Sequence, residues 1–515
     1  MQQNETMTMS LVKPCFEALD KKGVGTVDPQ DIIQVFYASG YDEKNSRTRR
    51  LIQALKQYQA PLDLASLSQL LEDQLSFYLR VFKNALVVPH FSEFTAFISQ
   101  CYHQLKQNRN GKVASYIPEL KTVDPDKLAI SVCTVDGQQF RIGDTQELFC
   151  VQSMIKPLLY LLALQENGLE RVHQHVGREP SGHNFNELML NHRHVPHNPM
   201  INAGAIMCSS MIKRRSRSAS RFKHVKSQLE SLSGRQYVGF NNAVYHSEKE
   251  TADRNYALSY LMREYKAFPK GTSLYNTLDL YFQACSIETN VDAFAVAAAT
   301  LANAGVCPLT TESVFAPDLV KNCLSLMYSC GMYDYSGEWA FSIGLPAKSG
   351  VAGGIYVVIP DVMGICIWSP RLDKHGNSTR GIAFCKALVE RYAIHNYDSV
   401  LKATTKNYLT ETRYGQQCNE GYLLLEAAGR QDLGQMIRLC ARGVDIDFVD
   451  YDGRSALHIA ASEGAEEIIG YLLAKGAYAG MVDRWGQTPA QQAQANGHVQ
   501  LSKQLQHSFE ARAGA

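Results

Sequence analysis

Two short motifs lie far apart in this chain, and both carry groups that serine chemistry needs. The first is Ser153 with Lys156 three residues later, and the second is Lys348-Ser349-Gly350. A serine hydroxyl is a poor nucleophile until a base takes its proton, and a lysine acts as that base only where burial keeps its amine partly neutral. Because residues i and i+3 share a helix face, we expect the hydroxyl of Ser153 and the amine of Lys156 to lie within reach of each other.

The copy of S-x-x-K at Ser153 is the one that suits a buried site. The tetrapeptide recurs at Ser10/Lys13, Ser210/Lys213, Ser220/Lys223 and Ser399/Lys402. Only the copy at Ser153 is followed by an apolar run, residues 158–164, that suits a buried helix. Proline is tolerated near a helix start and disruptive deeper in, so Pro157 predicts a helix that begins close to Ser153. The nucleophile would then lie near the positive end of the helix dipole.

The pairing of S-x-x-K with a late K-S-G resembles the serine acyl-transfer enzymes of the β-lactamase and penicillin-binding class. Apolar runs around short turns predict two β-hairpins, at residues 128–134 with 139–142 and at residues 354–359 with 362–368. A long helix is expected over residues 293–304. We therefore predict an α+β catalytic domain over residues 86–400, with a β-lactamase-like antiparallel sheet and helices beside it.

The composition argues against several classes of function. The 51 basic and 50 acidic side chains nearly cancel, so the charge balance gives no sign of nucleic acid or a membrane surface as a partner. No apolar stretch reaches the roughly 20 residues that a membrane span needs. The 13 cysteines include no C-x-x-C pair, which suits a reducing compartment and argues against a disulfide framework or a metal site. We expect a cytoplasmic protein, or a mitochondrial one only if a targeting segment is missing from this sequence.

The first 85 residues are predicted to be helical. Apolar residues recur at helical spacing over residues 11–19, 31–38, 47–57 and 67–82. Between the first two helices, Asp20 and Gly25 match the skeleton of an EF-hand loop. However, Lys22 and Val24 stand where calcium needs oxygen ligands, and Asp31 replaces the long bidentate glutamate. We interpret this region, residues 1–85, as a degenerate EF-hand-like pair used for packing or assembly.

The last part of the chain, residues 401–515, repeats with a period of 33 residues. Gly443 aligns with Gly476 and Gly453 with Gly486. Residues 455–460 and 488–493 imitate the T-P-L-H-x-A signature, so the tail resembles ankyrin repeats. Such a stack binds a protein partner or packs on a neighbour, and the sequence favours neither over the other.

Several central segments rich in polar groups indicate a family. They are residues 114–120, 197–205, 247–256, 279–288 and 329–334, followed by Gly-Leu-Pro-Ala-Lys-Ser-Gly-Val-Ala-Gly-Gly at residues 344–354. Together they resemble a serine-dependent glutaminase of the kidney and liver type. The helical front and the ankyrin tail match the longer animal members of that family. The resemblance implies hydrolysis of L-glutamine to L-glutamate and ammonia.

The resemblance also implies a role for each catalytic residue. Ser153 would attack the side-chain amide of glutamine, and Lys156 would be the general base. Tyr281 and Tyr333 would lie against the nucleophile and the leaving ammonia, where a phenol relays a proton. The backbone N–H groups of Ser153 and Val351 would hold the oxyanion.

Free glutamine carries an α-ammonium and an α-carboxylate, so a selective pocket needs an acid and a set of neutral donors. Glu248 suits the ammonium. The donors implied by the resemblance are Tyr116, Gln152, Asn202, Asn255 and Tyr281, with Ser153, Tyr333 and Val351 at the reacting end. Lys348 either faces the substrate or anchors its strand.

Members of this family are activated by inorganic phosphate and act as tetramers or larger assemblies, so we expect a phosphate activator, no other cofactor and a homo-oligomer. The matching activation loop is residues 177–197, with Met189 where many animal members carry an aromatic residue. The basic run at residues 213–226 departs from the usual composition of the family.

Two other interpretations compete with the glutaminase one. A cytosolic Ser/Lys acyl hydrolase of the β-lactamase-like class, acting on another amide, would use the same pair of motifs. A periplasmic enzyme of that class, a β-lactamase or transpeptidase, is disfavoured by the cysteine count and by the absence of an S-D-N segment between the two motifs. A non-catalytic ankyrin scaffold with an inactive hydrolase body is the second, and the presence of Ser153, Lys156, Tyr281 and Tyr333 argues against it.

Overall fold

The computed structural model describes residues 2–20, 23–182, 188–400, 405–410, 413–441 and 443–513. Lys22 of the EF-hand-like loop, part of the activation loop (residues 183–187) and Lys402 lie outside the described residues. The chain divides into two compact units, Met1–Asn396 and Tyr397–Ala515.

A five-stranded sheet lies at the centre of the first unit, in the strand order β2-β1-β8-β7-β6. The strands are β1 (Ala129–Thr134), β2 (Gln139–Gly143), β6 (Ala347–Ser349), β7 (Gly354–Ile359) and β8 (Met363–Trp368). All neighbours are antiparallel. Both predicted hairpins are present, and β1 joins them by pairing with β8, with Ala129 opposite Trp368.

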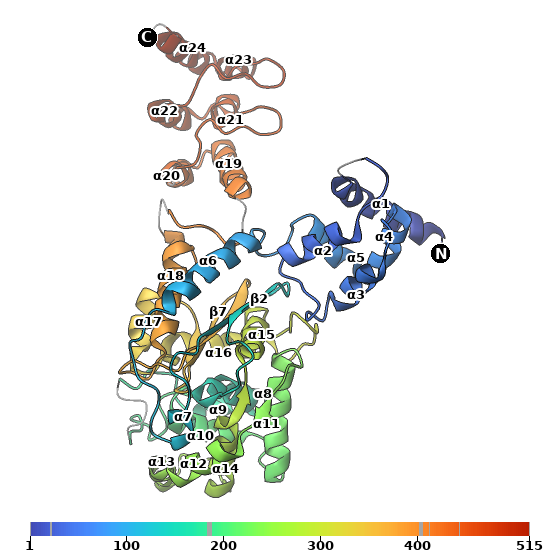
Figure 1. Ribbon diagram of the computed structural model, residues 1–515. Helices are drawn as coiled ribbons and strands as arrows, with labels where there is room; N and C mark the ends of the chain where they lie inside the picture. Colours follow the sequence, from blue (N-terminus) through green and yellow to red (C-terminus); the bar gives the residue numbers. More distant parts are fainter. Residues whose placement is uncertain are drawn as a thin grey trace. The chain divides into compact units, whose positions relative to one another are not determined.

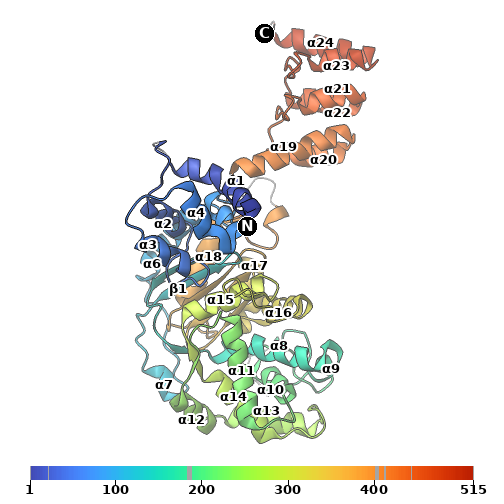
Figure 2. The ribbon, with the colours of Figure 1, turned by 90° about the vertical axis from the view of Figure 1, so that its right-hand side faces the viewer.

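Helices cover both faces of this sheet (Figures 1 and 2). On one face, α15 (Val291–Ala302) packs on β8, β1 and β7. Gly364 permits this approach, since a Cβ there would lie 2.2 Å from the backbone nitrogen of Ala299. Ile367, whose side chain points to the opposite face, lies beside Gly381 of α18 (Thr379–Arg391), and α18 packs against α6 (Phe91–Leu105).

A helical lobe and a small second sheet complete the catalytic region. The helices are α7 (Pro118–Lys121), α8 (Lys156–Asn167), α9 (Leu169–His175), α10 (Asn202–Met211), α11 (Ser218–Leu232), α12 (Asn242–Glu250), α13 (Asp253–Glu264), α14 (Leu274–Cys285), α16 (Pro317–Cys330) and α17 (Ser336–Ser342). The small sheet has the order β3 (Phe149–Cys150), β5 (Ile287–Thr289), β4 (Gly239–Phe240). The predicted α+β class with an antiparallel sheet is confirmed.

The helical front has its own apolar core, built from Ile32, Phe36, Ile52, Leu67 and neighbouring side chains. Its helices are α1 (Gln2–Leu19), α2 (Pro29–Ala38), α3 (Arg49–Gln57), α4 (Leu64–Leu71) and α5 (Leu75–Phe82). The prediction of one helix over residues 67–82 was wrong. The polar residues Glu72–Gln74 form a 3-10 turn, and Gln74 leaves the helical region with φ of −136° and ψ of 40°, so the chain changes direction before α5.

The side chain of Asp20 caps its own loop. Its two carboxylate oxygens accept the backbone N–H of Val24 at 3.1 Å and of Gly25 at 2.7 Å. We expect Asp20→Ala to cost about 1 kcal/mol of local stability, because two N–H groups lose their acceptor. Calcium should shift the melting temperature of neither the parent nor the variant. A calcium-dependent rise in the parent, measured by differential scanning fluorimetry, would contradict this prediction.

The helical front surrounds the tip of the β1–β2 hairpin. Tyr41 donates its hydroxyl to the carbonyl of Asp136 at 3.0 Å, and Asn45 donates to the carbonyl of Gly137 at 2.7 Å. The carboxylate of Asp136 pairs with Arg80 at 2.8 Å. These contacts fasten the front to an edge of the central sheet.

Within its described residues, the second unit contains three stacked helix pairs (Figure 1). They are α19 (Arg413–Gly429) with α20 (Leu433–Ala441), α21 (Ala456–Glu463) with α22 (Glu466–Lys475), and α23 (Pro489–Ala495) with α24 (Val499–Ala513). Ser455 and Thr488, one repeat apart, each form a capping box at the start of their helix. Gly464 and Gly476 end α21 and α22 in the left-handed conformation.

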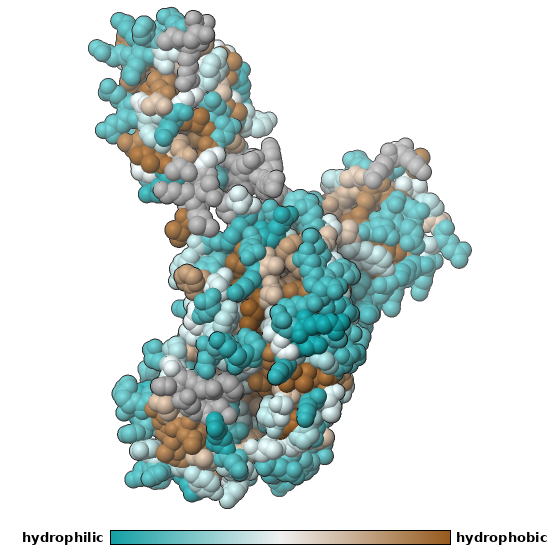
Figure 3. Space-filling model, turned by 60° about the vertical axis from the view of Figure 1, so that its left-hand side comes forward, coloured by the Kyte–Doolittle hydropathy of each residue, from teal (hydrophilic) through white to brown (hydrophobic). Residues whose placement is uncertain are grey.

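No helix within the described residues combines the length and the apolarity that crossing a bilayer requires. On the face shown in Figure 3, hydrophilic side chains cover much of the surface and hydrophobic ones lie in separate patches.

Candidate active site

The segment of the predicted nucleophile turns sharply into a buried helix. Gln152–Ile155 form a 3-10 turn that runs directly into α8 at Lys156, as Pro157 predicted. Ser153 is buried at the start of this turn. Gln152 has a φ of +50°, in the left-handed region that a non-glycine residue adopts at a cost of about 1–3 kcal/mol.

Lys156 is completely buried, and its amine donates to Oδ1 of Asn202 at 2.7 Å. Burial lowers the pKa of Lys156 to about 8, because the charged amine is poorly solvated there. A neutral amine is therefore accessible near physiological pH. This is the property that a lysine general base needs.

Tyr333 lies next to the nucleophile. Its hydroxyl donates to the carbonyl of Ser349 at 3.1 Å, and it also hydrogen-bonds Ser153 and the backbone of Val351. Burial raises the pKa of Tyr333 above its ordinary value, while the bonds with Ser153 and Val351 act in the opposite direction. The residue has a φ of +55°, so two of the residues around Ser153 adopt a strained backbone.

Lys348 anchors its strand. Its buried amine donates to the carbonyl of Gly331 at 3.1 Å and to that of Ser349 at 2.8 Å, and it lies 4.6 Å from the ring centre of Tyr333. Burial and the neighbouring Lys156 hold the pKa of Lys348 well below its usual value. The sequence left two roles open for Lys348, facing the substrate or anchoring its strand. These contacts support the anchoring role.

A second group of polar side chains surrounds Glu248. The hydroxyl of Tyr116 donates to Oε1 of Glu248 at 2.5 Å and lies 2.7 Å from Oε1 of Gln152. Burial raises the pKa of Glu248, and its hydrogen bonds with Tyr116 and Gln152 oppose that rise. A cation that enters here would favour the carboxylate form.

A further set of hydrogen bonds is centred on Asn202. The hydroxyl of Tyr281 donates to Oδ1 of Asn202 at 3.2 Å, the same atom that accepts from Lys156. Asn202 in turn donates its Nδ2 to Oδ1 of Asn255 at 3.3 Å. Asn202 therefore orients the amine of Lys156. Sequence reasoning assigned Asn202 only to substrate binding.

A cavity of about 620 Å³ lies between these groups. Its lining includes eight of the ten predicted site residues, namely Tyr116, Gln152, Ser153, Asn202, Glu248, Asn255, Tyr281 and Val351. Lys156 does not line it, and Tyr333 lines a different cavity. Cys285 and Arg254 also line the cavity; both lie in polar segments that the sequence singled out, but sequence reasoning assigned no role to either. Burial raises the pKa of Cys285 to about 12, so this thiol is no rival nucleophile at neutral pH.

Comparison with known proteins decides the family. A profile described as Glutaminase matches residues 111–397, and one described as ankyrin repeats matches residues 392–513. The chain belongs to the glutaminase family. The enzyme hydrolyses L-glutamine to L-glutamate and ammonia, as the sequence motifs indicated. The inactive scaffold is thereby rejected, and the β-lactamase-like hydrolase of another amide loses its basis.

Relatives and solved structures agree with this assignment. The chain is 45% identical to the mitochondrial liver isoform of glutaminase from Rattus norvegicus over 430 residues, which cover 83% of this chain and 71% of the rat protein. It is 43% identical to the glutaminase of Trichormus variabilis over 308 residues, 59% of this chain and 90% of that protein. A structure described as a probable glutaminase from Bacillus subtilis complexed with 6-diazo-5-oxo-L-norleucine superimposes with a TM-score of 0.51 and 30% identity, covering 58% of this chain and 94% of that one.

Proposed function

We propose that this glutaminase works through an acyl-enzyme on Ser153. The Oγ of Ser153 attacks the side-chain amide carbon of glutamine while its proton passes to the amine of Lys156. The tetrahedral intermediate collapses, the C–N bond breaks, and the proton leaves with ammonia. Water then hydrolyses the glutamyl ester with the same base, which releases glutamate and restores the serine. The observation that carries this proposal is the completely buried Lys156 amine one helical turn from the buried serine.

The oxyanion is held by the backbone N–H groups of Ser153 and Val351. Val351 already hydrogen-bonds the Tyr333 hydroxyl, which in turn bonds Ser153. A phenol in that position is suited to carry a proton between the serine and the leaving nitrogen. Tyr281 supports Lys156 from the other side through their shared acceptor, Asn202.

Specificity for a free amino acid comes from Glu248. Its carboxylate binds the α-ammonium, with Tyr116 and Gln152 fixing its orientation. The α-carboxylate of the substrate is bound by the neutral Nδ2 donor of Asn255, while the hydroxyl hydrogen of Tyr281 stays on Asn202. An analogue without these charged ends would leave buried polar atoms unpaired, which is a strong basis for discrimination.

The experiment that tests this substrate assignment is a coupled ammonia assay on glutamine and on asparagine, with and without phosphate. We expect turnover of glutamine and little turnover of asparagine, whose shorter side chain places the amide carbon away from Ser153 when its α-groups are bound. Faster release of ammonia from asparagine would contradict the assignment. Mass spectrometry of protein quenched during turnover should find a glutamyl adduct on the peptide that contains Ser153.

The pH dependence of the reaction should follow Lys156. Only the neutral amine accepts a proton, and its pKa is lowered to about 8. We expect kcat/KM to fall about tenfold per pH unit well below pH 8 and to level off above it. Initial rates of ammonia release from pH 6 to pH 9.5 measure this profile. A flat profile between pH 6 and pH 9 would contradict Lys156 as the base.

Assembly, activation and cellular setting are also part of this proposal. Inorganic phosphate is the activator, and the active form is a homo-oligomer, a tetramer or larger, to which the loop containing the half-exposed Met189 contributes. The ankyrin stack binds a protein partner through exposed side chains such as Tyr451 and Trp485. The described cysteines are all free thiols, which fits a reducing compartment such as the cytoplasm, although the rat relative is named mitochondrial.

A further inference from the structure

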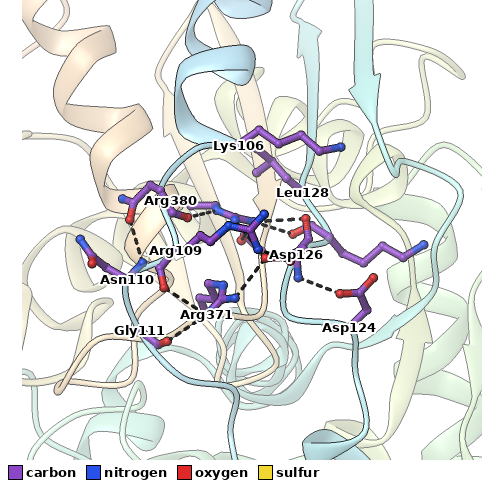
Figure 4. Close-up of polar contacts among 12 residues, drawn as sticks. Lys106, Arg109, Asn110, Gly111, Asp124, Asp126, Leu128, Arg371 and Arg380 are labelled. Carbon is purple, nitrogen blue, oxygen red and sulfur yellow. Dashed lines mark hydrogen bonds and ion pairs between the residues drawn. The ribbon is translucent and has the colours of Figure 1, made fainter.

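A cluster of charged residues fastens both ends of the segment that carries Tyr116 (Figure 4). We call this segment, residues 108–127, the strap. Arg380 at the start of α18 is completely buried, and its Nε donates to the carbonyl of Asn108 at 2.8 Å. Its Nη1 donates to the carbonyl of Asp126 at 3.3 Å. One guanidinium therefore binds the beginning and the end of the strap together.

Two further arginines complete the cluster around the Asp126 carboxylate. Arg371 donates its Nη2 to Oδ1 of Asp126 at 3.0 Å and its Nη1 to the carbonyl of Arg109 at 3.0 Å. Arg109 pairs with Oδ2 of Asp126 at 2.6 Å. Hydrogen bonds from Arg371 and Arg109 lower the pKa of Asp126, so the carboxylate stays charged. The two ends of the strap are thus held together by side chains from the strap itself and by arginines from the segment that follows β8.

The middle of the strap reaches the substrate cavity. Ile117 and Leu120 are buried against Val244 of α12, the helix that also carries Glu248. From this position the Tyr116 hydroxyl donates to Glu248. The position of the Tyr116 hydroxyl therefore depends on how the two ends of the strap are held.

Residues 369–380, which hold the two ends of the strap, also contact the part of the site that contains Tyr333 and Val351. Asn377 donates to the carbonyl of Met332, the residue before Tyr333, at 3.2 Å. The N–H of Ser369 donates to the carbonyl of Gly353, two residues after Val351, at 3.0 Å. Residues 369–380 thus set the strap relative to the groups that carry out the chemistry.

We propose that Arg371, Arg380 and Asp126 are positioning residues for substrate recognition. They fix the strap so that Tyr116 orients the Glu248 carboxylate toward the α-ammonium of glutamine. The inference rests on the proposed role of Glu248 in binding that ammonium. Because the three residues act on recognition and touch neither Ser153 nor the substrate, their loss should raise KM and leave kcat nearly unchanged.

The test uses Arg371→Lys in the full chain, since lysine keeps the charge but cannot reach two acceptors in the fixed geometry of a guanidinium. We expect KM for glutamine to rise about tenfold, the effect of a lost charge-assisted hydrogen bond, with kcat within about threefold of the parent. Tyr116→Phe should raise KM similarly, and the double variant should show no more than the larger single effect. Arg235→Lys, which changes an arginine paired with Glu312 elsewhere, is the matched control and should keep the parental KM.

The outcomes separate this inference from the proposed site. If Tyr116→Phe leaves KM unchanged, the proposed recognition by Glu248 and Tyr116 is wrong. If Tyr116→Phe raises KM but Arg371→Lys does not, or if the two effects multiply, the positioning role is wrong. Should Arg371→Lys fail to fold, Asp126→Asn provides the same comparison at a half-exposed carboxylate, and a parental KM in that variant would overturn the inference.

Discussion

Ser153→Ala is expected to abolish glutamine hydrolysis, with kcat lower by about 10⁵-fold, the scale of nucleophile removal in a serine enzyme. The Cys285 thiol, which also lines the cavity, does not replace the serine, because burial keeps it protonated at neutral pH. Ammonia release under saturating glutamine measures the loss. The substrate should still bind, since Glu248 and Asn255 are untouched.

The chain contains a matched control for this variant. Ser220 and Lys223 repeat the S-x-x-K spacing on α11, where both side chains are exposed. Ser220→Ala should therefore keep the parental rate and melting temperature. If Ser153→Ala kept even a tenth of the parental rate, the acyl-enzyme proposal would be abandoned.

Lys156→Met should lower kcat by about 10³-fold, the contribution of a general base. Methionine has a similar length and no charge, so it fills the buried site without the cost of an ammonium group. We therefore expect the melting temperature to stay the same or rise while activity is lost. Loss of activity without loss of thermal stability would show that Lys156 has a catalytic and not a structural role.

The pH profile gives a second readout of the same variant. The rise in kcat/KM through pH 8 should disappear in Lys156→Met, because its cause, the titration of the amine, has been removed. Lys223→Met, on the exposed copy of the motif, should keep both the rate and the rise. An unchanged inflection in Lys156→Met would assign the titration to another group.

Much of the fold could be predicted because its signals are local. The two hairpins follow from apolar runs around Asp136-Gly137 and Pro360-Asp361, and the buried helix after Ser153 follows from a continuous apolar run. The break inside residues 67–82 was missed because Leu71 and Leu75 keep the helical spacing across it. Periodicity does not report a change of chain direction when the apolar pattern continues.

In the candidate site, too, local features of the sequence were predictable, whereas backbone angles and contacts between distant segments were not. The side chains around the cavity lie in segments rich in polar groups, which a sequence displays directly. The positive φ angles of Gln152 and Tyr333 carry no such signal, because neither residue type favours that conformation. The partners of Arg380 in the strap, Asn108 and Asp126, lie more than two hundred residues earlier in the chain, so no sequence spacing predicts these contacts.

Because the tip of the β1–β2 hairpin is enclosed, the rate of proteolysis there measures how firmly the helical front is attached to the central sheet. Exposed turns are preferred cleavage sites, yet here Tyr41, Asn45 and Arg80 occupy the space a protease would need around Asp136-Gly137. Cutting at this turn requires the front to swing away first. The rate of nicking at Asp136-Gly137 under mild digestion therefore reports how often the helical front detaches from the folded enzyme.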